Sequence, residues 1–293
     1  MPEMPEVEAH AERLERQFGG RILSKFTPFN FTALKTAVPA PDEAYGWPLL
    51  GVSRRGKYLI LRFDPVSFVV HLMQGGRLLA DEKRSAKPRG GQARFTFEPV
   101  NIPSTDDRPG SIDETALLLT EQGKERRAGV WCVPSAELET SPPLTKLGPE
   151  AAGISADDLA ERFATNSMRV HGFLRHQGMV AGIGRRLSNE VCHAAQISPF
   201  ATTKQLGAQG AAKVAAAIEH CVAEALAAER TREDMSSSKD RPSAVHKRTG
   251  EACPVCGDTI HEVTYSSYSV NYCPTCQTGG KILADNTTSK FLK

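Results

Sequence analysis

The stretch Cys253-Pro254-Val255-Cys256 is followed, after 16 intervening residues, by Cys273-Pro274-Thr275-Cys276 near the C-terminus. Each Cys-x-x-Cys turn presents two thiolates to one side, and a hairpin of about 15 to 20 residues lets a second pair complete a tetrahedron. The spacing therefore predicts a zinc ribbon in which these four cysteines hold one structural Zn²⁺. A disulfide framework is the weaker alternative, and a metal site alone indicates only that this end folds around metal.

The chain has 293 residues, 40% of them hydrophobic, so it can bury the cores of about two domains. No apolar run approaches the roughly 18 residues of a membrane span, and acidic residues occupy the place of a signal peptide's basic region. The remaining cysteines stand singly among apolar neighbours, as buried thiols of a reducing compartment do: Cys132, Cys192 and Cys221. We expect a cytoplasmic protein with no membrane partner.

The distribution of charge is more informative than the net charge, which is only +2. Residues 162–189 contain five arginines and no Asp or Glu, and residues 83–94 form a second acid-free basic cluster. A third cluster, residues 239–248, is diluted by Asp240. Each cluster alone could be a solvated surface, but three of them beside a metal module favour a polyanionic partner such as nucleic acid.

The apolar spacing predicts a β-rich part followed by a helical part. Apolar residues at helical spacing before Gly19-Gly20 predict a leading amphipathic helix that includes Val7 and Phe18. Short β-rich runs between residues 21 and 134 predict a sandwich or barrel. These runs are 47–52, 58–63, 68–72, 93–97, 116–120 and 129–133, whereas Pro99 to Asp113, with three prolines and three acidic residues, is predicted to be a loop.

The helical part follows a linker rich in proline at residues 135–150. Ser155 before Asp157-Asp158 is a predicted N-cap for a helix reaching Phe163. Further helices are predicted at residues 172–177, 185–195 and 203–230. The expected fold is therefore α+β and multi-domain, with a leading helix and β-sandwich at 1–134, a linker at 135–150, a helical domain at 151–247 and a zinc ribbon at 248–293.

The N-terminal residues Met1-Pro2-Glu3 allow a second kind of chemistry, a covalent reaction at the N-terminal amine. Pro2 is small enough for Met1 to be removed, which leaves a secondary amine whose reference pKa of about 7.7 to 8 gives an appreciable neutral fraction. A neutral amine can attack a sugar carbon and form a covalent iminium, as a Schiff-base lysine does, and Glu3 could move the protons. Taken alone, proline followed by acids is also an ordinary lead into a helix.

In combination, Met1-Pro2-Glu3-Met4-Pro5-Glu6-Val7-Glu8 and the order of helix, β-rich runs, helical domain and four-cysteine ribbon resemble one family. This is the formamidopyrimidine-DNA glycosylase and endonuclease VIII family of base-excision repair enzymes, and the resemblance covers essentially the whole chain. Further matching stretches are Arg54-Arg55-Gly56-Lys57-Tyr58-Leu59, Leu147-Gly148-Pro149-Glu150, Gln177 with Ala181-Gly182-Ile183-Gly184 and Glu190, and Tyr272-Cys273-Pro274-Thr275-Cys276-Gln277.

The resemblance implies a glycosylase with abasic-site lyase activity that removes oxidised bases, purines in particular, and then cleaves the strand. Pro2 would be the nucleophile at C1′, Glu3 the acid/base, Glu6 a second acidic position of the motif, and Lys57 a phosphate contact that assists catalysis. The sandwich would be the catalytic domain and residues 151–247 a helix-two-turn-helix DNA-binding domain. The partner would be double-stranded DNA with damaged bases or abasic sites, bound by a monomer associated with the bacterial nucleoid.

The resemblance also implies residues that fill the gap left by a flipped nucleotide, and here the chain departs from the family. Arg126 falls where the family has an intercalating arginine, and Gln74, with Met73 one place early, falls where it has a void-filling Met. Ala128 stands where many members have a Phe wedge. Arg185 replaces the phosphate-binding Asn after the glycine turn, which keeps hydrogen-bond donors and adds charge.

The largest departure is Tyr268, where the family's zinc finger has an arginine that grips phosphates. A neutral phenol cannot replace a bidentate guanidinium. Another cation, such as Arg248 or Lys281, would then contact DNA, or activity on duplex DNA would be weakened, or the substrate would differ. The nearby tyrosines could stack on unpaired bases or simply pack within the hairpin.

Two alternatives to the glycosylase stay open at this stage. The first is a lyase-only or non-catalytic protein that binds damaged DNA on the same fold. The second is a zinc-ribbon adaptor for RNA or protein, which would leave the Pro2-Glu3 end unexplained.

Overall fold

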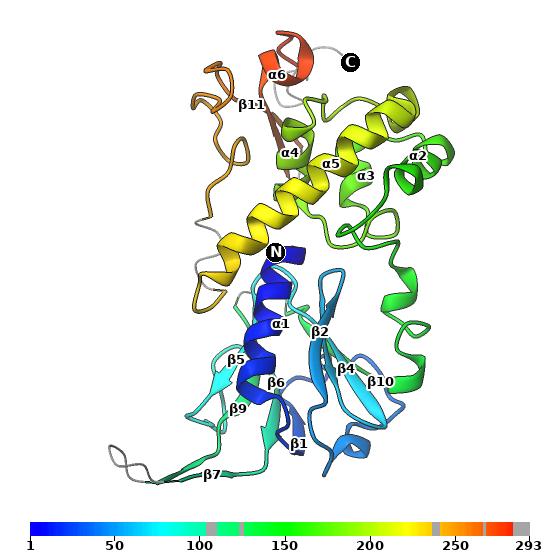
Figure 1. The fold of residues 1–293 in the computed structure, drawn as a ribbon. Helices are drawn as coiled ribbons and strands as arrows, with labels where there is room; N and C mark the ends of the chain where they lie inside the picture. The colour runs from blue at the N-terminus through cyan, green and yellow to red at the C-terminus, as the bar shows by residue number, and fades with distance from the viewer. Residues whose placement is uncertain (104–109, 123–125, 236–240, 266–267, 284–293) are drawn as a thin grey trace. The chain divides into compact units, whose positions relative to one another are not determined.

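The computed structural model describes residues 1–103, 110–122, 126–235, 241–265 and 268–283. The chain divides into two units (Figure 1), of which the first holds Met1–Pro2 and Glu6–Lys146 and the second holds Glu3–Pro5 and Leu147–Lys293. The predicted α+β class, with a sandwich, a helical part and a ribbon, is confirmed. Among the helices described, none has the length and apolar character needed to cross a membrane.

The first unit is built on two four-stranded antiparallel sheets. One sheet has the strand order β1-β6-β9-β5 and the other has the order β10-β4-β3-β2. The strands are β1 (Leu23–Pro28), β2 (Gly51–Arg55), β3 (Tyr58–Arg62), β4 (Val66–His71), β5 (Gly76–Asp81), β6 (Gly91–Phe97), β9 (Ala116–Glu121) and β10 (Gly129–Pro134).

Aromatic side chains from both sheets form the core of this sandwich. The Phe68 ring of β4 lies with its centroid 5.5 Å from that of Phe26 in β1 and 5.1 Å from that of Phe95 in β6. Such pairs add about 0.5 to 1.5 kcal/mol each beyond the burial of their surface. Helix α1 (Met4–Phe18) adds its apolar stripe to the core, and the Phe18 and Phe97 ring centroids are 5.4 Å apart.

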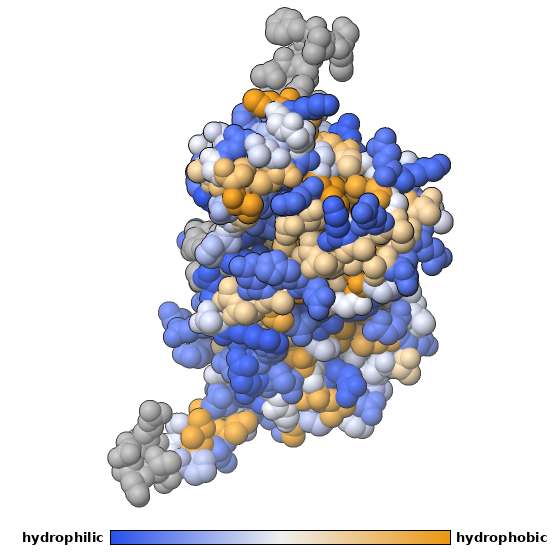
Figure 2. All heavy atoms as spheres, turned by 45° about the horizontal axis from the view of Figure 1, so that its top comes forward, coloured by the Kyte–Doolittle hydropathy of each residue, from blue (hydrophilic) through white to orange (hydrophobic). Residues whose placement is uncertain are grey.

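The prediction of a loop from Pro99 to Asp113 is wrong at both of its ends. Strand β7 (Val100–Ile102) pairs with β8 (Ser111–Asp113) in an antiparallel hairpin, and residues 104–109 lie outside the described part. The prolines flank these strands without interrupting them, so the β-branched residues can pair. The hairpin exposes the apolar side chains of Val100, Ile102 and Ile112. Figure 2 shows apolar residues in orange on the surface at the lower left of the molecule.

Two strands of the sandwich were not predicted, and one was misplaced. Strand β1 exposes the consecutive residues Ser24 and Lys25, and strand β5 exposes Leu79 and Ala80, so neither follows the simple alternation that marks a half-buried strand. The run predicted at residues 47–52 overlaps only the start of β2, which begins at Gly51.

The helical part of the second unit contains α2 (Ala156–Thr165), α3 (Val170–Arg175), α4 (Arg185–Ala194) and α5 (Thr203–Arg230). The predicted Ser155 cap of α2 is confirmed, because its hydroxyl accepts a hydrogen bond from the Asp158 amide at 3.0 Å. The Phe163 and Phe173 rings meet edge to face, with centroids 5.0 Å apart, in a core to which α5 contributes mainly alanine and valine.

The same unit ends in the ribbon, formed by β11 (His261–Thr264), β12 (Ser269–Tyr272) and α6 (Pro274–Thr278). The buried cluster that includes Cys253 and Cys273 also contains Val245 and Ile260, and metal binding to a site of this kind contributes directly to folding stability. Gln277 joins the ribbon to the helical part by donating to the Ile197 carbonyl at 3.0 Å.

Candidate active site and metal centre

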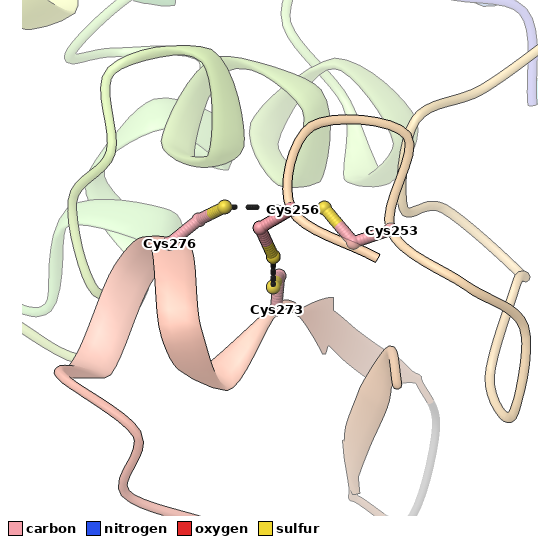
Figure 3. A group of neighbouring side chains, drawn as sticks. All are labelled: Cys253, Cys256, Cys273 and Cys276. Atoms are coloured by element: carbon pink, nitrogen blue, oxygen red, sulfur yellow. Dashed lines mark hydrogen bonds between the residues drawn. The ribbon is translucent and has the colours of Figure 1, made fainter. Parts of the chain in front are cut away.

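The four predicted zinc ligands lie together at the ribbon (Figure 3), with all four Sγ atoms within 4.8 Å of one another. The Sγ–Sγ distance is 3.9 Å between Cys253 and Cys276 and 3.4 Å between Cys256 and Cys273. A tetrahedral site with Zn–S bonds of about 2.3 Å has sulfur–sulfur edges of about 3.8 Å. The donor set therefore fits one structural Zn²⁺, as predicted.

Neighbouring groups hold the two cysteine turns in this arrangement. The Nε2 atom of His193, on α4, lies 3.3 Å from the Cys253 sulfur, where a ring N–H can donate to a thiolate. Asp258, beside the first turn, accepts hydrogen bonds from the amide and the hydroxyl of Thr275, between the cysteines of the second turn. Hydrogen bonds thus join the two cysteine turns to each other and join the ribbon to α4.

At the N-terminus, the Glu3 carboxylate caps helix α4. One oxygen accepts a hydrogen bond from the Arg186 amide and the other from the Leu187 amide, both at 2.9 Å. The first amides of a helix have no partner within the helix, and the helix dipole favours an anion there. Glu3, which is only 5% exposed, is therefore held in place by main-chain donors of α4.

The glycines of the turn before α4 are required by this close approach. The Met4 amide donates to the Gly182 carbonyl at 2.9 Å, and Gly182 has φ of +99°. A β-carbon on Gly182 would lie 2.8 Å from the Met4 β-carbon, and one on Gly184 would lie 2.2 Å from the Glu3 carboxylate. Bulkier residues at either glycine would displace the N-terminal segment.

Pro2, the predicted nucleophile, is partly exposed and directly precedes Glu3, and Met1 is 49% exposed. Because hydrogen bonds fix the Glu3 side chain, they also restrict the position of the peptide bond between Pro2 and Glu3. Glu6, the second acidic position of the motif, lies on α1 and is buried.

The register of the two sheets brings three other predicted residues to one end of the sandwich. Tyr58 and Gly129 both pair with His71, at the end of β4, and Gly76 pairs with Glu121, at the end of β9. The turns between β2 and β3, β4 and β5, and β9 and β10 therefore leave the same end. These turns carry Lys57, Gln74 and Arg126 respectively.

The side chains at this end differ in exposure. Lys57 is buried, whereas Gln74 and Arg126 are exposed. A β-carbon on Gly75 would lie 3.0 Å from the Gln122 carbonyl oxygen, so the turn with Gln74 packs closely on the segment that leads to Arg126. Lys124 and Glu125, which precede Arg126 in the predicted motif, lie outside the described residues.

Ala128 is turned into the sandwich, and an aromatic side chain that the sequence analysis missed is exposed at the same end. Ala128 is fully buried, and its amide donates to the Glu121 carboxylate at 2.6 Å. Phe31, which follows β1, is 98% exposed. The sequence signal for it is weak, because Phe31 stands between the polar residues Asn30 and Thr32 after β1, a strand that was not predicted.

Hydrogen bonds fix the Phe31 turn between two strands. The Phe29 amide donates to the Gln92 carbonyl of β6, and the Val130 amide of β10 donates to the Ala33 carbonyl, each at 2.8 Å. Within the turn, Asn30 accepts hydrogen bonds from the amide and the hydroxyl of Thr32, both at 3.1 Å. Phe31 is therefore an exposed ring on a well-supported turn.

His71 lies close to Lys57 at this end of the sandwich. Burial, together with the positive charge of Lys57, lowers the pKa of His71 to about 4. The His71 ring centroid is 4.5 Å from that of Tyr58. The imidazole is thus neutral at pH 7, and the positive charge beside it belongs to Lys57.

The two remaining predicted DNA contacts lie in the second unit. Arg185 is half-buried at the first position of α4. Arg248 donates to the Glu251 carboxylate at 2.8 Å and to the carbonyls of Ser243 and Ala244 at 3.2 and 3.1 Å. These contacts brace the start of the ribbon. Lys281 is exposed, and residues 236–240 are outside the described ranges.

Comparison with known proteins gives two family models and many relatives. The model described as formamidopyrimidine-DNA glycosylase N-terminal domain matches residues 1–111, and the model described as a zinc finger found in FPG and IleRS matches residues 250–279. The formamidopyrimidine-DNA glycosylase of Alkalilimnicola ehrlichii is 30% identical over 295 residues, which cover 94% of this chain and 100% of the relative.

An uncharacterised formamidopyrimidine-DNA glycosylase-like protein of Mycobacterium tuberculosis is 42% identical over 161 residues, covering 52% of this chain and 98% of the relative. Among solved structures, that of Lactococcus lactis Fpg (MutM) in a complex with DNA containing N7-benzyl-Fapy-dG has a TM-score of 0.81 at 22% identity. The alignment covers 94% of this chain and 100% of the Lactococcus lactis chain. This similarity supports the fold described above.

Replacement of one zinc ligand should release the metal. We expect Cys256→Ser to lower the zinc content from about one ion per chain to a small fraction, because three thiolates bind far more weakly than a closed four-thiolate site. Elemental analysis after gel filtration measures the ratio. Cys221→Ala, which removes a thiol outside the cluster, is the matched control, and full zinc occupancy of the Cys256 variant would contradict the assignment.

Acid should destabilise the first unit through His71. A histidine whose folded pKa is about 4 and whose unfolded pKa is about 6.5 stabilises the fold above pH 6.5, and this contribution is lost as the pH falls toward 4. Between pH 7 and pH 5 the loss from this residue is at most about 2 kcal/mol.

Urea unfolding at pH 7, 6 and 5 measures this effect. The variant His71→Gln should show a weaker dependence of the unfolding free energy on pH than the unmodified protein. His176→Gln, at an exposed position, should keep the full dependence. Equal pH dependence in the His71 variant and the unmodified protein would show that His71 is not the group responsible.

Proposed function

Because the chain belongs to the formamidopyrimidine-DNA glycosylase family, we propose that it removes oxidised bases, purines in particular, from double-stranded DNA in the bacterial nucleoid. We propose further that it cleaves the strand at the resulting abasic site. The observation that carries this proposal is the Glu3 carboxylate held by two α4 amides next to Pro2. An N-terminal amine beside a fixed carboxylate is what covalent base excision requires.

In the proposed reaction, the Pro2 nitrogen bonds to C1′ as the bond from C1′ to the base breaks. The base leaves with the bonding electrons and takes up a proton. Opening of the sugar ring at O4′ then gives an iminium between Pro2 and C1′. Loss of a C2′ proton expels the 3′ phosphate and breaks the strand, and water finally releases the sugar remnant from Pro2.

Glu3 is the proposed acid and base for the proton transfers of this reaction. Because both oxygens are held by main-chain donors, the carboxylate needs little reorganisation when charge develops nearby. The cap thereby serves catalysis as well as folding.

Lys57 is the proposed contact for a phosphate beside the lesion. Lys57 is a buried positive charge beside His71, which is neutral at pH 7. A buried lysine interacts with a phosphate more strongly than a solvated one does, because the local dielectric is lower. Lys57 would thus position the strand for attack at C1′.

Base removal requires the nucleotide to leave the stack, and the gap must be filled. We propose that Arg126, Gln74 and Phe31, all exposed at the same end of the sandwich, enter this gap. Phe31 offers the planar apolar group that buried Ala128 cannot supply, since proteins that unstack DNA commonly insert such wedges.

Reduction with borohydride should trap the protein on a duplex that contains an abasic site. The iminium becomes a stable amine on reduction, so the product is a covalent complex that survives denaturing electrophoresis. We expect Pro2→Gly, or a form that retains Met1, to abolish trapping, because each removes the free secondary amine. Lys213→Ala, which removes an exposed lysine of α5 that is not among the predicted DNA contacts, should trap as the unmodified protein does.

The same assay on a panel of oxidised-base duplexes separates the proposed activity from its main alternative. Trapping on both lesion and abasic duplexes supports a glycosylase with lyase activity. Trapping on abasic DNA alone would favour a lyase-only protein. Absence of any trapped species with correctly processed protein would leave a protein that binds damaged DNA without acting on it, and would overturn the enzymatic proposal.

Phe31→Ala should slow base excision in single-turnover assays by about 10-fold or more, because stacking of a base on an aromatic side chain contributes about 1–3 kcal/mol. Since Phe31 is 98% exposed, the thermal stability should not change. Phe31→Trp keeps a planar ring and should retain most of the rate. An unchanged excision rate in the alanine variant would exclude Phe31 from the gap.

A further inference from the structure

Two tyrosines close the hairpin of the zinc ribbon. The Tyr265 amide donates to the Tyr268 carbonyl at 2.8 Å, between the ends of β11 and β12. Their rings are stacked, with centroids 4.8 Å apart and an angle of 16° between the ring planes. The hairpin thus ends in a pair of ordered aromatic rings.

The Tyr268 ring also lies against helix α3. It is stacked on the His171 ring, with centroids 6.2 Å apart and an interplanar angle of 11°. The Arg175 guanidinium carbon lies 3.9 Å from the Tyr268 ring centroid. Residues four apart share one face of a helix, so His171 and Arg175 together form the surface of α3 that receives Tyr268.

The positive charge at this contact belongs to Arg175. Burial and the charge of Arg175 lower the pKa of His171 to about 3, so the imidazole is neutral at pH 7. A cation over a tyrosine ring within about 6 Å is attracted to it, and the contact uses none of the five N–H donors of the guanidinium. Arg175 is therefore ordered without its donors being consumed.

A second arginine, Arg169, is hydrogen-bonded to the other tyrosine, Tyr265. Arg169 donates to the Tyr265 hydroxyl at 2.8 Å, and its guanidinium carbon lies 5.5 Å from the Phe200 ring centroid. Across the described residues, neither Arg169 nor Arg175 forms an ion pair with a carboxylate. Both belong to residues 162–189, which contain no Asp or Glu.

We propose that Arg175, held on Tyr268, binds a phosphate of the DNA strand at the tip of the zinc ribbon, with Arg169 as a second contact. The tyrosine at position 268 then acts as the support for a cation contributed by α3. Ordering of the arginine before binding reduces the entropy lost when it engages a phosphate. The inference rests on the proposed function only in taking DNA as the partner.

The test is the salt dependence of binding to a duplex that contains a tetrahydrofuran abasic-site analogue. This analogue cannot form an iminium, so binding is measured without catalysis. The slope of log K against log salt falls by about 0.9 for each phosphate contact removed. We expect Arg175→Ala to lower the slope by about 1 and to weaken binding at 100 mM salt by roughly tenfold.

A positional swap makes the test specific. In the double variant Arg175→Ala with Tyr268→Arg, the hairpin supplies the positive charge in place of α3. The slope of log K against log salt and the affinity should then both recover substantially. Arg162→Ala removes one charge from the same basic stretch on α2 without touching the tyrosines, and it should leave the slope unchanged. Melting temperature and zinc content verify that each variant is folded.

An unchanged slope and affinity in folded Arg175→Ala protein would overturn the proposal. This outcome is distinguishable from failure of the proposed function, which shows as absence of borohydride trapping while binding to the analogue persists. A loss of binding equal in the Arg175 and Arg162 variants would also overturn it, because it would indicate a diffuse charge effect in place of a defined phosphate site.

Discussion

The hydrogen bonds from the first amides of α4 to the Glu3 carboxylate are the constraint on which the candidate active site depends. They join the first residues of the chain to a helix that begins more than 180 residues later in the sequence. The approach is possible only because the preceding turn carries Gly182 and Gly184, where a β-carbon would collide with Met4 or Glu3. One electrostatic contact thereby explains the acid after Pro2 and the glycine turn together.

A second assembly depends on strand register. Three turns separated widely in sequence reach one end of the sandwich, because β4 and β9 end there and β3, β5 and β10 begin there. A lysine, a glutamine, an arginine and an exposed phenylalanine meet at that end, although each comes from a different connection. The strand register thus gathers the groups proposed to contact the phosphate beside the lesion and to fill the gap in the duplex.

Local patterns were sufficient to predict much of this structure. The cysteine spacing, the Ser155 cap and the bounds of α5, apart from its kink at Gly207, follow from rules that act within a few residues. Features that depend on partners distant in sequence were missed. Strands β1 and β5, whose own alternation is weak, are placed by their pairing with β6 and β9. The contact of Arg175 with Tyr268 likewise exists only after α3 and the hairpin meet.

The most direct test of the account is the site of covalent attachment to DNA. The borohydride-reduced complex with abasic DNA can be digested with nuclease and protease, and the modified peptide identified by mass spectrometry. We expect a sugar-derived mass on the peptide that begins at Pro2, located on its N-terminal nitrogen. Attachment to a lysine side chain, with Lys57 as the foremost candidate, would contradict the role assigned to Pro2 and Glu3.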